Sequence, residues 1–304
     1  MLSKKDLEIK TNHHYVWAHY LSAWAVDGRN VWYTTKKNKI VSDSVKGLAK
    51  EKYFYQVPPL DTEDSEFLKD YISRSSFSHC VNHCLGVLME LSDAYSQFHS
   101  YEKKGDSEGI ERCKALFSKA IENRYEKIER DFRASLSSLC EGNLAALQDL
   151  KMRTYLLDYV ATQYWRTPYM KSQFIESVKD AAIKRMVDKN WWMISYVHGY
   201  SMGSALISQT NAIRFTLLKC PKDMDFITSD NPVINTHSLP LEYADLYFPV
   251  CPEYAVIASK SGSFKEGLVE LDESETKNWN LKIDNQKYIH AFATTKETLE
   301  KLHK

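Results

Sequence analysis

Glycine and proline are scarce in this chain, which has 10 Gly and 8 Pro among 304 residues. Ordinary usage is about 7% and about 5%. Tight turns depend on these two residues, because Gly reaches positive φ without strain and Pro fixes φ. The shortage therefore argues against a β-sandwich with many turns and favours long helices. Hydrophobic residues make up 43% of the chain and aromatic residues 12%, which excludes a disordered or collagen-like protein.

An excess of charge is also absent, since 40 Lys and Arg balance 40 Asp and Glu. This balance argues against a protein that coats nucleic acid or an anionic membrane. No stretch approaches the ~18 uncharged apolar residues of a membrane helix, and the charged start MLSKKDLEIK is not followed by a signal-peptide core. Six cysteines stand singly, apart from Cys80 and Cys84. We expect a reduced, cytoplasmic protein without membrane association.

Signature motifs of the common enzyme classes are missing. The chain has no G-x-G-x-x-G, P-loop, H-E-x-x-H or G-x-S-x-G sequence, so the common nucleotide-binding and hydrolase classes lose most of their support. The segment His79–Cys84, HCVNHC, holds metal-ligand residue types, but a zinc site needs three or four convergent ligands. Successive helical residues rotate by about 100°. We therefore favour buried thiols on a helix over a metal site here.

The middle of the chain is predicted to be helical. Residues 61–100 contain no Pro and one Gly, and apolar side chains recur at steps of three and four from Ile110 to Leu139. The polar segment 102–109 is expected to be a loop. A further helix is expected from about Leu144 to Arg166. Thr167 can then cap the next helix, with Pro168 at its first position.

After about Trp191 the pattern changes to short β-branched and aromatic segments, which are typical of strands. Strands that follow a block of helices favour an α+β fold with a mostly antiparallel sheet over a parallel α/β fold. We expect a single domain over residues 1–304. Its parts are an N-terminal helix with short strands (1–60), a helical part (61–190) and a sheet-rich part (191–304).

The N-terminal segment predicts a helix that begins at Asn12, with strands around VWYTT (31–35) and KYFYQV (52–57). His13 and His14 would then lie at a helix N-terminus, where free N–H groups favour anions.

Further along the chain, Gln163 and Arg166 stand three apart on one helix face, so both side chains can reach one site. Arg166 can alternatively complement the dipole at the end of its helix. Asp230 follows a buried-looking strand, where a carboxylate can either serve a site or form an Asx turn.

These segments resemble the bacterial domain of unknown function family 4238. Its H-H-Y-V, Q-x-x-R-T-P, T-S-D-N-P-V and F-P-x-x-P elements are matched by His13–Val16, Gln163–Pro168, Thr228–Val233 and Phe248–Pro252. The chain departs from the family pattern at Trp17, where Pro is usual, and at Cys251, where Ser is usual. The pair Ile128–Glu129 is similar to an Ile-Glu pair of the family. The resemblance implies one cleft between helices and sheet.

The resemblance marks a polar set that suits chemistry at a phosphate ester. We expect His14, Glu129 and Asp230 to be catalytic, and His13, Gln163, Arg166 and Asn231 to bind substrate. In this hypothesis Arg166 clamps the anion, His14 acts as acid or base, and Asp230 orients His14. Glu129 and Asp230 could alternatively hold Mg²⁺ or Mn²⁺ through carboxylate oxygens.

The favoured interpretation is an effector that cleaves RNA, DNA or a nucleotide, as a toxin or phage-defence component does. The sequence leaves a second class open, a non-catalytic binding or sensor protein whose polar cluster is structural or holds a small anion. A protein partner would then supply the activity, and abundant Tyr and Trp suit such an interface. A third alternative is group transfer from a nucleotide such as NAD.

Overall fold

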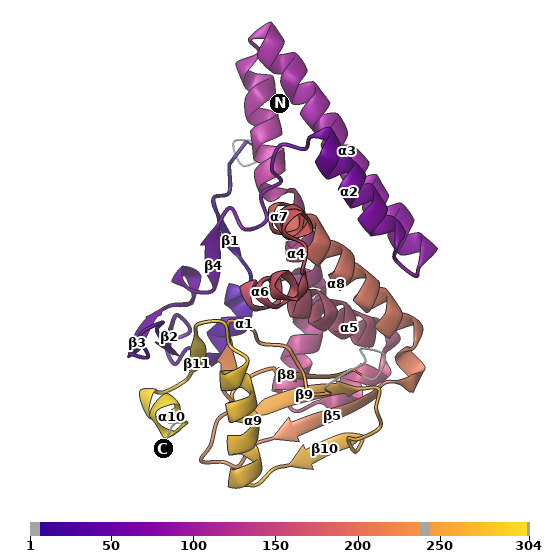
Figure 1. Ribbon diagram of the computed structural model, residues 1–304. Coiled ribbons are helices and arrows are strands. Elements are labelled where there is room, and N and C mark those ends of the chain that lie inside the picture. Colours follow the sequence, from indigo (N-terminus) through magenta and orange to yellow (C-terminus); the bar gives the residue numbers. More distant parts are fainter. Residues whose placement is uncertain (1–6, 238–243, 303–304) are drawn as a thin grey trace.

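Long helices occupy the middle of the chain, and the strands gather near its start and in its last third (Figure 1). The computed structural model describes residues 7–237 and 244–302. Over these residues the architecture is α+β, as the sequence predicts, and its sheets are antiparallel apart from one strand pair. No helix within these two ranges is long and apolar enough to cross a membrane.

The helical middle contains a long antiparallel hairpin, α3 and α4, which projects from the rest of the molecule with α2 alongside α3 (Figure 1). The helices are α2 (Thr62–Ser73), α3 (Ser78–Lys104), α4 (Ser107–Cys140), α5 (Leu150–Trp165), α6 (Pro168–Ser177), α7 (Ala181–Lys189) and α8 (Trp191–Ser208). A 3₁₀ turn at Leu144–Gln148 is followed by the extended residue Asp149, so the helix predicted from about Leu144 begins only at Leu150. The predicted cap of α6 is confirmed, because the Thr167 hydroxyl accepts the N–H of Met170 at 3.3 Å.

The loop expected at residues 102–109 shrinks to two residues between α3 and α4. Gly105 ends α3 in the left-handed region, with φ of 67°, where Gly has no Cβ to clash. Asp106 then caps α4 by accepting the N–H of Gly109 at 3.0 Å. A polar composition predicted a loop here, but these residue types serve equally as helix caps.

Helix α8 corrects the prediction that strand structure begins at about Trp191. Its first seven residues are buried, so its aromatic and β-branched side chains reflect burial and not a strand. Glycines let α8 approach α5 closely: a Cβ at Gly199 would lie 3.2 Å from the Cα of Thr162. The first strand after the helices, β5, starts at Arg214.

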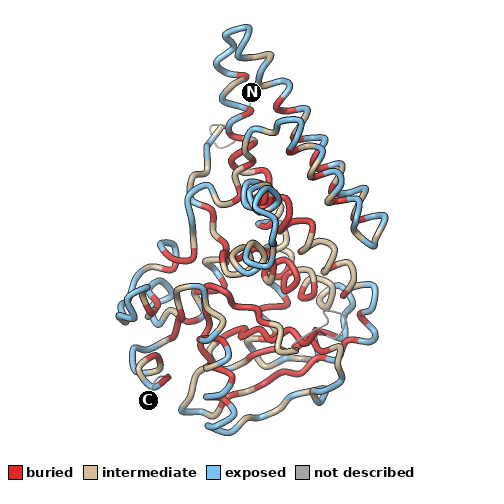
Figure 2. Tube along the Cα trace, in the orientation of Figure 1, coloured by how far each residue is buried: buried red, intermediate tan, exposed pale blue. Residues whose placement is uncertain are grey.

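A five-stranded sheet forms the base of the molecule, in the order β10-β5-β9-β8-β7. The strands are β5 (Arg214–Lys219), β7 (Ile234–Asn235), β8 (Asp245–Pro249), β9 (Tyr254–Ser259) and β10 (Gly267–Glu270), and only the pair β10–β5 is parallel. Helices α4 and α5 cover one face through Phe248, and α9 (Glu273–Asn285) covers the other, where Trp279 stacks on Tyr247. Figure 2 shows these central strands buried, because both of their faces are covered.

A four-stranded antiparallel sheet joins the two ends of the chain, in the order β3-β2-β11-β6. Its strands are β2 (Asn30–Thr34), β3 (Ile40–Ser44), β6 (Thr228–Ser229) and β11 (Ala291–Ala293), and α10 (Lys296–Lys301) packs beside them. In the register, Ala293 lies opposite Trp32 and Ala291 opposite Ser229. The strand predicted at 31–35 is therefore confirmed. It pairs with the nearby β3 on one side and with β11, some 260 residues away, on the other.

The first predicted helix is wrong in its position. Residues Asn12–His14 form strand β1, which pairs with β4 (Lys50–Lys52), and the helix α1 covers only Ala18–Leu21 before a 3₁₀ turn at Ser22–Trp24. His13 and His14 thus lie on a strand, not at a helix N-terminus. The strand predicted at 52–57 is also misplaced, because the strand found there, β4, ends at Lys52. The apolar spacing of this segment suggested a helix. Strand β1 could not be predicted from it, because the β1–β4 pairing depends on residues distant in the sequence.

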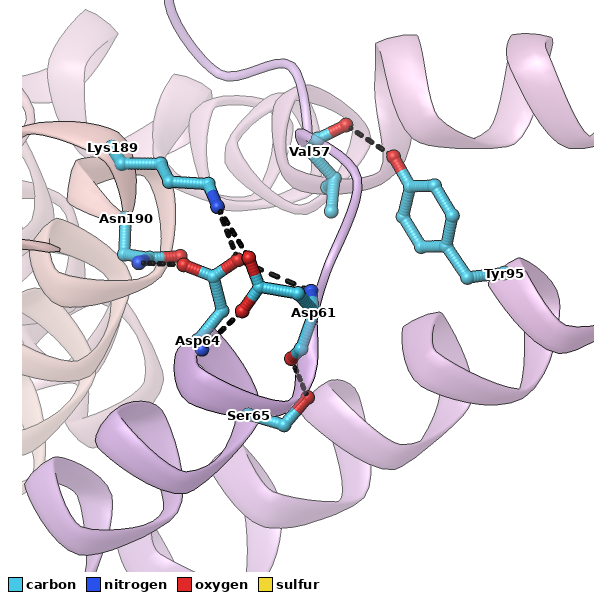
Figure 3. Close-up of polar contacts among 7 residues, drawn as sticks. All are labelled: Val57, Asp61, Asp64, Ser65, Tyr95, Lys189 and Asn190. Carbon is cyan, nitrogen blue, oxygen red and sulfur yellow. Dashed lines mark hydrogen bonds and ion pairs between the residues drawn. The ribbon is translucent and has the colours of Figure 1, made fainter.

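A buried carboxylate fixes α2 to the junction of α7 and α8 (Figure 3). Asp64 is 0% exposed and contacts the ammonium of Lys189 and the amide of Asn190, the latter at 2.9 Å. Asp61 and Asp64 also cap α2 reciprocally: each carboxylate accepts the other residue's backbone N–H.

Candidate functional site

Arg166, at the end of α5, forms a buried ion pair with Glu129 of α4. The guanidinium Nη2 lies 2.7 Å from Glu129 Oε1, and Arg166 is 1% exposed. Gln163 accepts hydrogen bonds from Nε and Nη2 of Arg166 at 2.9 and 2.6 Å, and its amide donates to the carbonyl of Tyr15 at 2.9 Å. The structure thus brings three of the expected residues together and ties α4, α5 and the N-terminal segment through them.

The surroundings of this pair shift the pKa of both partners. Burial raises the pKa of Glu129, and Arg166 opposes that rise. Burial alone would lower the pKa of Arg166, but Glu129 and the Tyr55 hydroxyl more than offset it, and that pKa is raised. The guanidinium carbon lies 5.3 Å from the centre of the Tyr125 ring. Arg166 therefore faces protein groups, and it is not an exposed clamp for a phosphate.

A pocket of about 260 Å³ opens beside the ion pair, against α4 and α1. It is lined by His14, Trp17, Ala18, Glu122, Tyr125, Glu126, Glu129, Arg130 and Arg133. Glu122, Arg130 and Arg133 were not predicted from the sequence. The signal that could have found them is their spacing: Glu122 and Arg133 stand seven and four residues from Glu129, and Arg130 stands four residues after Glu126, so each pair lies on one helix face.

His14 carries the only imidazole in the lining of this pocket. Its Nδ1 is buried and makes no hydrogen bond within the described part of the chain. Burial lowers the pKa of His14, and the nearby charges of Lys50 and Arg166 lower it further. The ring is therefore neutral at pH 7. A neutral imidazole with an unpartnered nitrogen can accept or transfer a proton.

Glu122 lines the same pocket, and the pKa of its carboxyl group is shifted in the direction that suits a proton donor. Burial raises its pKa, and the charge of Lys10 opposes this. Its Oε2 atom is buried without a hydrogen bond in residues 7–237 and 244–302. Lys10 Nζ lies 3.6 Å from that oxygen and His13 Nε2 lies 4.0 Å from it. The lining of the pocket thus contains both the neutral imidazole of His14 and the Glu122 carboxyl group, whose pKa is raised.

His13 is held by the backbone and lies outside the pocket lining. Its Nδ1 accepts the N–H of Tyr55 at 2.7 Å, so Nε2 carries the hydrogen and donates to the carbonyl of Lys10 at 3.2 Å. The ring is 0% exposed and stacks on Tyr55, with centroids 5.8 Å apart. Burial lowers the pKa of His13. The contacts of this histidine are those of a structural residue that positions β1.

Asp230 also lies outside the pocket lining and is 0% exposed. Its carboxylate accepts the backbone N–H groups of Tyr288, Ile289 and His290 at 2.7 to 2.8 Å. Burial raises the pKa of Asp230, and these three donors oppose the rise. Asp230 does not orient His14 as expected, because the hydrogen bonds of the Asp230 carboxylate all come from backbone N–H groups of residues 288–290.

Asn231 connects the sheet to the start of α6. Its Oδ1 accepts the hydroxyl of Thr167 at 2.9 Å, and its amide donates to the carbonyl of Gln286 at 3.0 Å. Since Thr167 follows Arg166, the segment 163–168 touches the segment 228–233 directly. Only His14 and Glu129 of the seven expected residues line the pocket, while Gln163 and Arg166 lie behind Glu129.

The expected divalent-ion pair of Glu129 and Asp230 is engaged elsewhere, with Arg166 and with backbone N–H groups. Within the described ranges, no group of three or more His, Cys, Asp or Glu side chains could hold a metal ion. In the segment 79–84, Cys80 and Cys84 are buried, and His83 contacts the hydroxyl of Tyr196 at 2.8 Å.

Comparison with known proteins identifies one family. No curated protein and no solved structure matches the chain. The model of the family described as protein of unknown function (DUF4238) matches residues 12–294. That match covers strand β1 with its partner β4, the Glu129–Arg166 ion pair, the residues that line the pocket and all four sequence elements named above. The chain therefore belongs to the DUF4238 family.

Proposed function

We propose that the pocket beside the Glu129–Arg166 pair is the active site of an enzyme that cleaves phosphodiester bonds in nucleic acid or nucleotides. The observation that carries the proposal is the unpartnered, buried Nδ1 of His14 in a pocket that also holds a carboxyl group of raised pKa. General acid–base catalysis requires such a pair. Two exposed arginines at the same pocket supply charge for an anion.

In this proposal His14 accepts the proton of the attacking hydroxyl or water, and Glu122 donates a proton to the leaving oxygen. Arg130 and Arg133 attract the phosphate, since guanidinium groups pair well with its oxygens. Arg166 acts as a positioning residue, because its ion pair holds the Glu129 side chain in the lining of the pocket. The cellular role that we propose for such cleavage is that of a toxin or phage-defence effector.

The test is turnover by the purified chain on RNA, single- and double-stranded DNA and nucleotides, each with Mg²⁺, with Mn²⁺ and with a chelator. We expect His14→Ala to reduce the rate by about 10²- to 10⁴-fold, the usual contribution of a general acid or base. The matched control is His99→Ala, an exposed histidine paired with Glu102. Absence of turnover on every substrate, or equal rates for both variants, would contradict the proposal.

A non-catalytic binding protein is the second candidate, and one observation favours it. Arg166, Gln163, Asp230 and Asn231 are all at most 1% exposed, and each is bonded to other protein groups. In this case the pocket holds a small anion through Arg130 and Arg133. Calorimetric titration with inorganic phosphate separates the two candidates: saturable binding without any turnover supports this one.

A further inference from the structure

Two cysteines meet where the end of α4 packs against the turn between β8 and β9. Cys140 is the last residue of α4, and Cys251 is the second residue after β8. The Cys140 sulfur lies 3.3 Å from the carbonyl oxygen of Val250, and the Cys251 sulfur lies 3.9 Å from the carbonyl oxygen of Cys140. Each thiol thus lies against the backbone of the other segment, although 111 residues separate them.

The two sulfurs also influence each other's protonation. The proximity of Cys251 raises the pKa of Cys140, and burial raises it further. The proximity of Cys140 lowers the pKa of Cys251, and burial opposes this. Because the thiolate is the reactive form of cysteine, this direction favours Cys251 as the nucleophile of the pair. Cys251 is buried, but Cys140 beside it is half-buried, so a small oxidant can approach the pair from the side of Cys140.

The other cysteines have different surroundings. Burial raises the pKa of Cys84 and of Cys220 to about 12 in each case. Cys113 donates to the carbonyl of Ala94, and Cys220 to the carbonyl of Met224. The pair at the α4 junction therefore differs from these three thiols in having a lowered pKa on one member.

We propose that Cys140 and Cys251 are a dithiol modification site that hydrogen peroxide oxidises reversibly to a disulfide. The Cys251 thiolate attacks one peroxide oxygen, which gives a sulfenic acid on Cys251 and, with one proton, one water. The Cys140 sulfur then attacks the Cys251 sulfur, the S–O bond breaks, and the thiol proton leaves with the hydroxyl group as a second water. Two thiols and one peroxide thus yield one disulfide and two waters.

The bond would fix the helical part to the sheet. Helix α4 carries Glu122 and Glu129, so oxidation would restrain one wall of the pocket at its far end. A disulfide that closes a long loop stabilises mainly by restricting the unfolded chain. We expect the oxidised protein to melt at least about 5 °C higher than the reduced protein.

The experiment treats the full chain with hydrogen peroxide, blocks the remaining thiols and digests the protein with trypsin. Cleavage gives peptides 134–151 and 223–260, which carry Cys140 and Cys251, and places Cys220 on a separate peptide, 220–222. The expected product is the 134–151/223–260 pair, which disappears after reduction. Mass spectrometry detects it, and thermal melting of the same sample gives the shift.

Three variants give the controls. Cys251→Ser should abolish the cross-link, whereas Cys140→Ser should leave a sulfenic acid on Cys251 that dimedone traps. Cys220→Ser removes a thiol whose sulfur lies 3.4 Å from the carbonyl of Pro252 and should leave the cross-link unchanged. A cross-link from Cys251 to Cys220, or no cross-link under conditions that oxidise dithiothreitol fully, would overturn the proposal.

Discussion

Arg166 and Glu129 are joined by a 2.7 Å ion pair that is almost completely removed from solvent. The pair is a property of the fold as well as of the site, because Arg166 ends α5 and Glu129 lies in the middle of α4. A buried charge that loses its partner costs far more than an exposed one.

Removal of one partner should therefore destabilise the protein strongly. We expect Arg166→Met to lower the free energy of unfolding by about 3–5 kcal/mol, because Glu129 is left buried and unpaired. The double variant Arg166→Met/Glu129→Leu should recover part of that loss. Urea unfolding measures both. As a control, Arg112→Ala breaks an exposed pair with Glu108 and should cost below about 1 kcal/mol.

The two neighbouring histidines should respond differently to substitution. His13→Ala removes the acceptor for the Tyr55 N–H and should lower the free energy of unfolding by about 1–3 kcal/mol. His14→Ala removes a ring that contacts the backbone of Leu48 but whose Nδ1 has no hydrogen bond in the described part of the chain, so we expect a smaller loss of stability than for His13→Ala. A larger loss of stability for His14→Ala than for His13→Ala would show that His14 is structural.

The Asp230 carboxylate should be needed for folding and not for binding in the pocket. Asp230→Asn leaves backbone donors of Tyr288, Ile289 and His290 without a charged acceptor, and we expect a loss of about 2–3 kcal/mol. Phosphate affinity at 25 °C should stay within a factor of two. A large fall in affinity with unchanged unfolding would contradict this assignment. Asp70→Asn, at an exposed carboxylate, is the control.

His198 should make stability depend on pH. Burial lowers its pKa to about 4, from 6.5 in the unfolded chain. As the pH falls below 6.5 the unfolded state binds the proton first, so stability falls between pH 6.5 and pH 4 and is unaffected above this window. The full effect is about 3 kcal/mol. It is measured as the difference between wild type and His198→Gln in unfolding free energy across pH. Equal pH profiles would refute it.

Asp64 should matter more than its capping partner. Asp64→Ala removes the contacts to Lys189 and Asn190 and leaves the asparagine amide without its acceptor (Figure 3). We expect a loss of about 2–4 kcal/mol for Asp64→Ala. Asp61→Ala removes an exposed cap and should cost about 1 kcal/mol. Chemical unfolding of the two variants in parallel is the measurement, and equal losses would contradict the ranking.

Local patterns in the sequence predicted much of the helical part. The stripe from Ile110 to Leu139 lies within α4, and the cap at Thr167 occurs as predicted. Both depend on residues a few positions apart. Strand β1 and helix α8 were not predicted correctly, because one requires a partner at residues 50–52 and the other is buried on all sides at its start.

The site could be predicted only in part. Resemblance selected His14 and Glu129, which share the pocket, but it could not show that Arg166 is shielded by Glu129 and Gln163. Whether a polar side chain faces protein or solvent depends on tertiary packing. Glu122 and Arg133 were missed because an amphipathic helix is expected to carry charges along its solvated side.

Strand β11 lies between β2 and β6 in the four-stranded sheet, although it comes from residues 291–293. During synthesis, β2 therefore leaves the ribosome soon before its neighbour β3 but long before its other neighbour, β11, so the edge that faces β11 stays unpaired until then. The loop 288–290 that binds Asp230 arrives at the same late moment. A nascent chain stalled before residue 288 would have neither of these contacts.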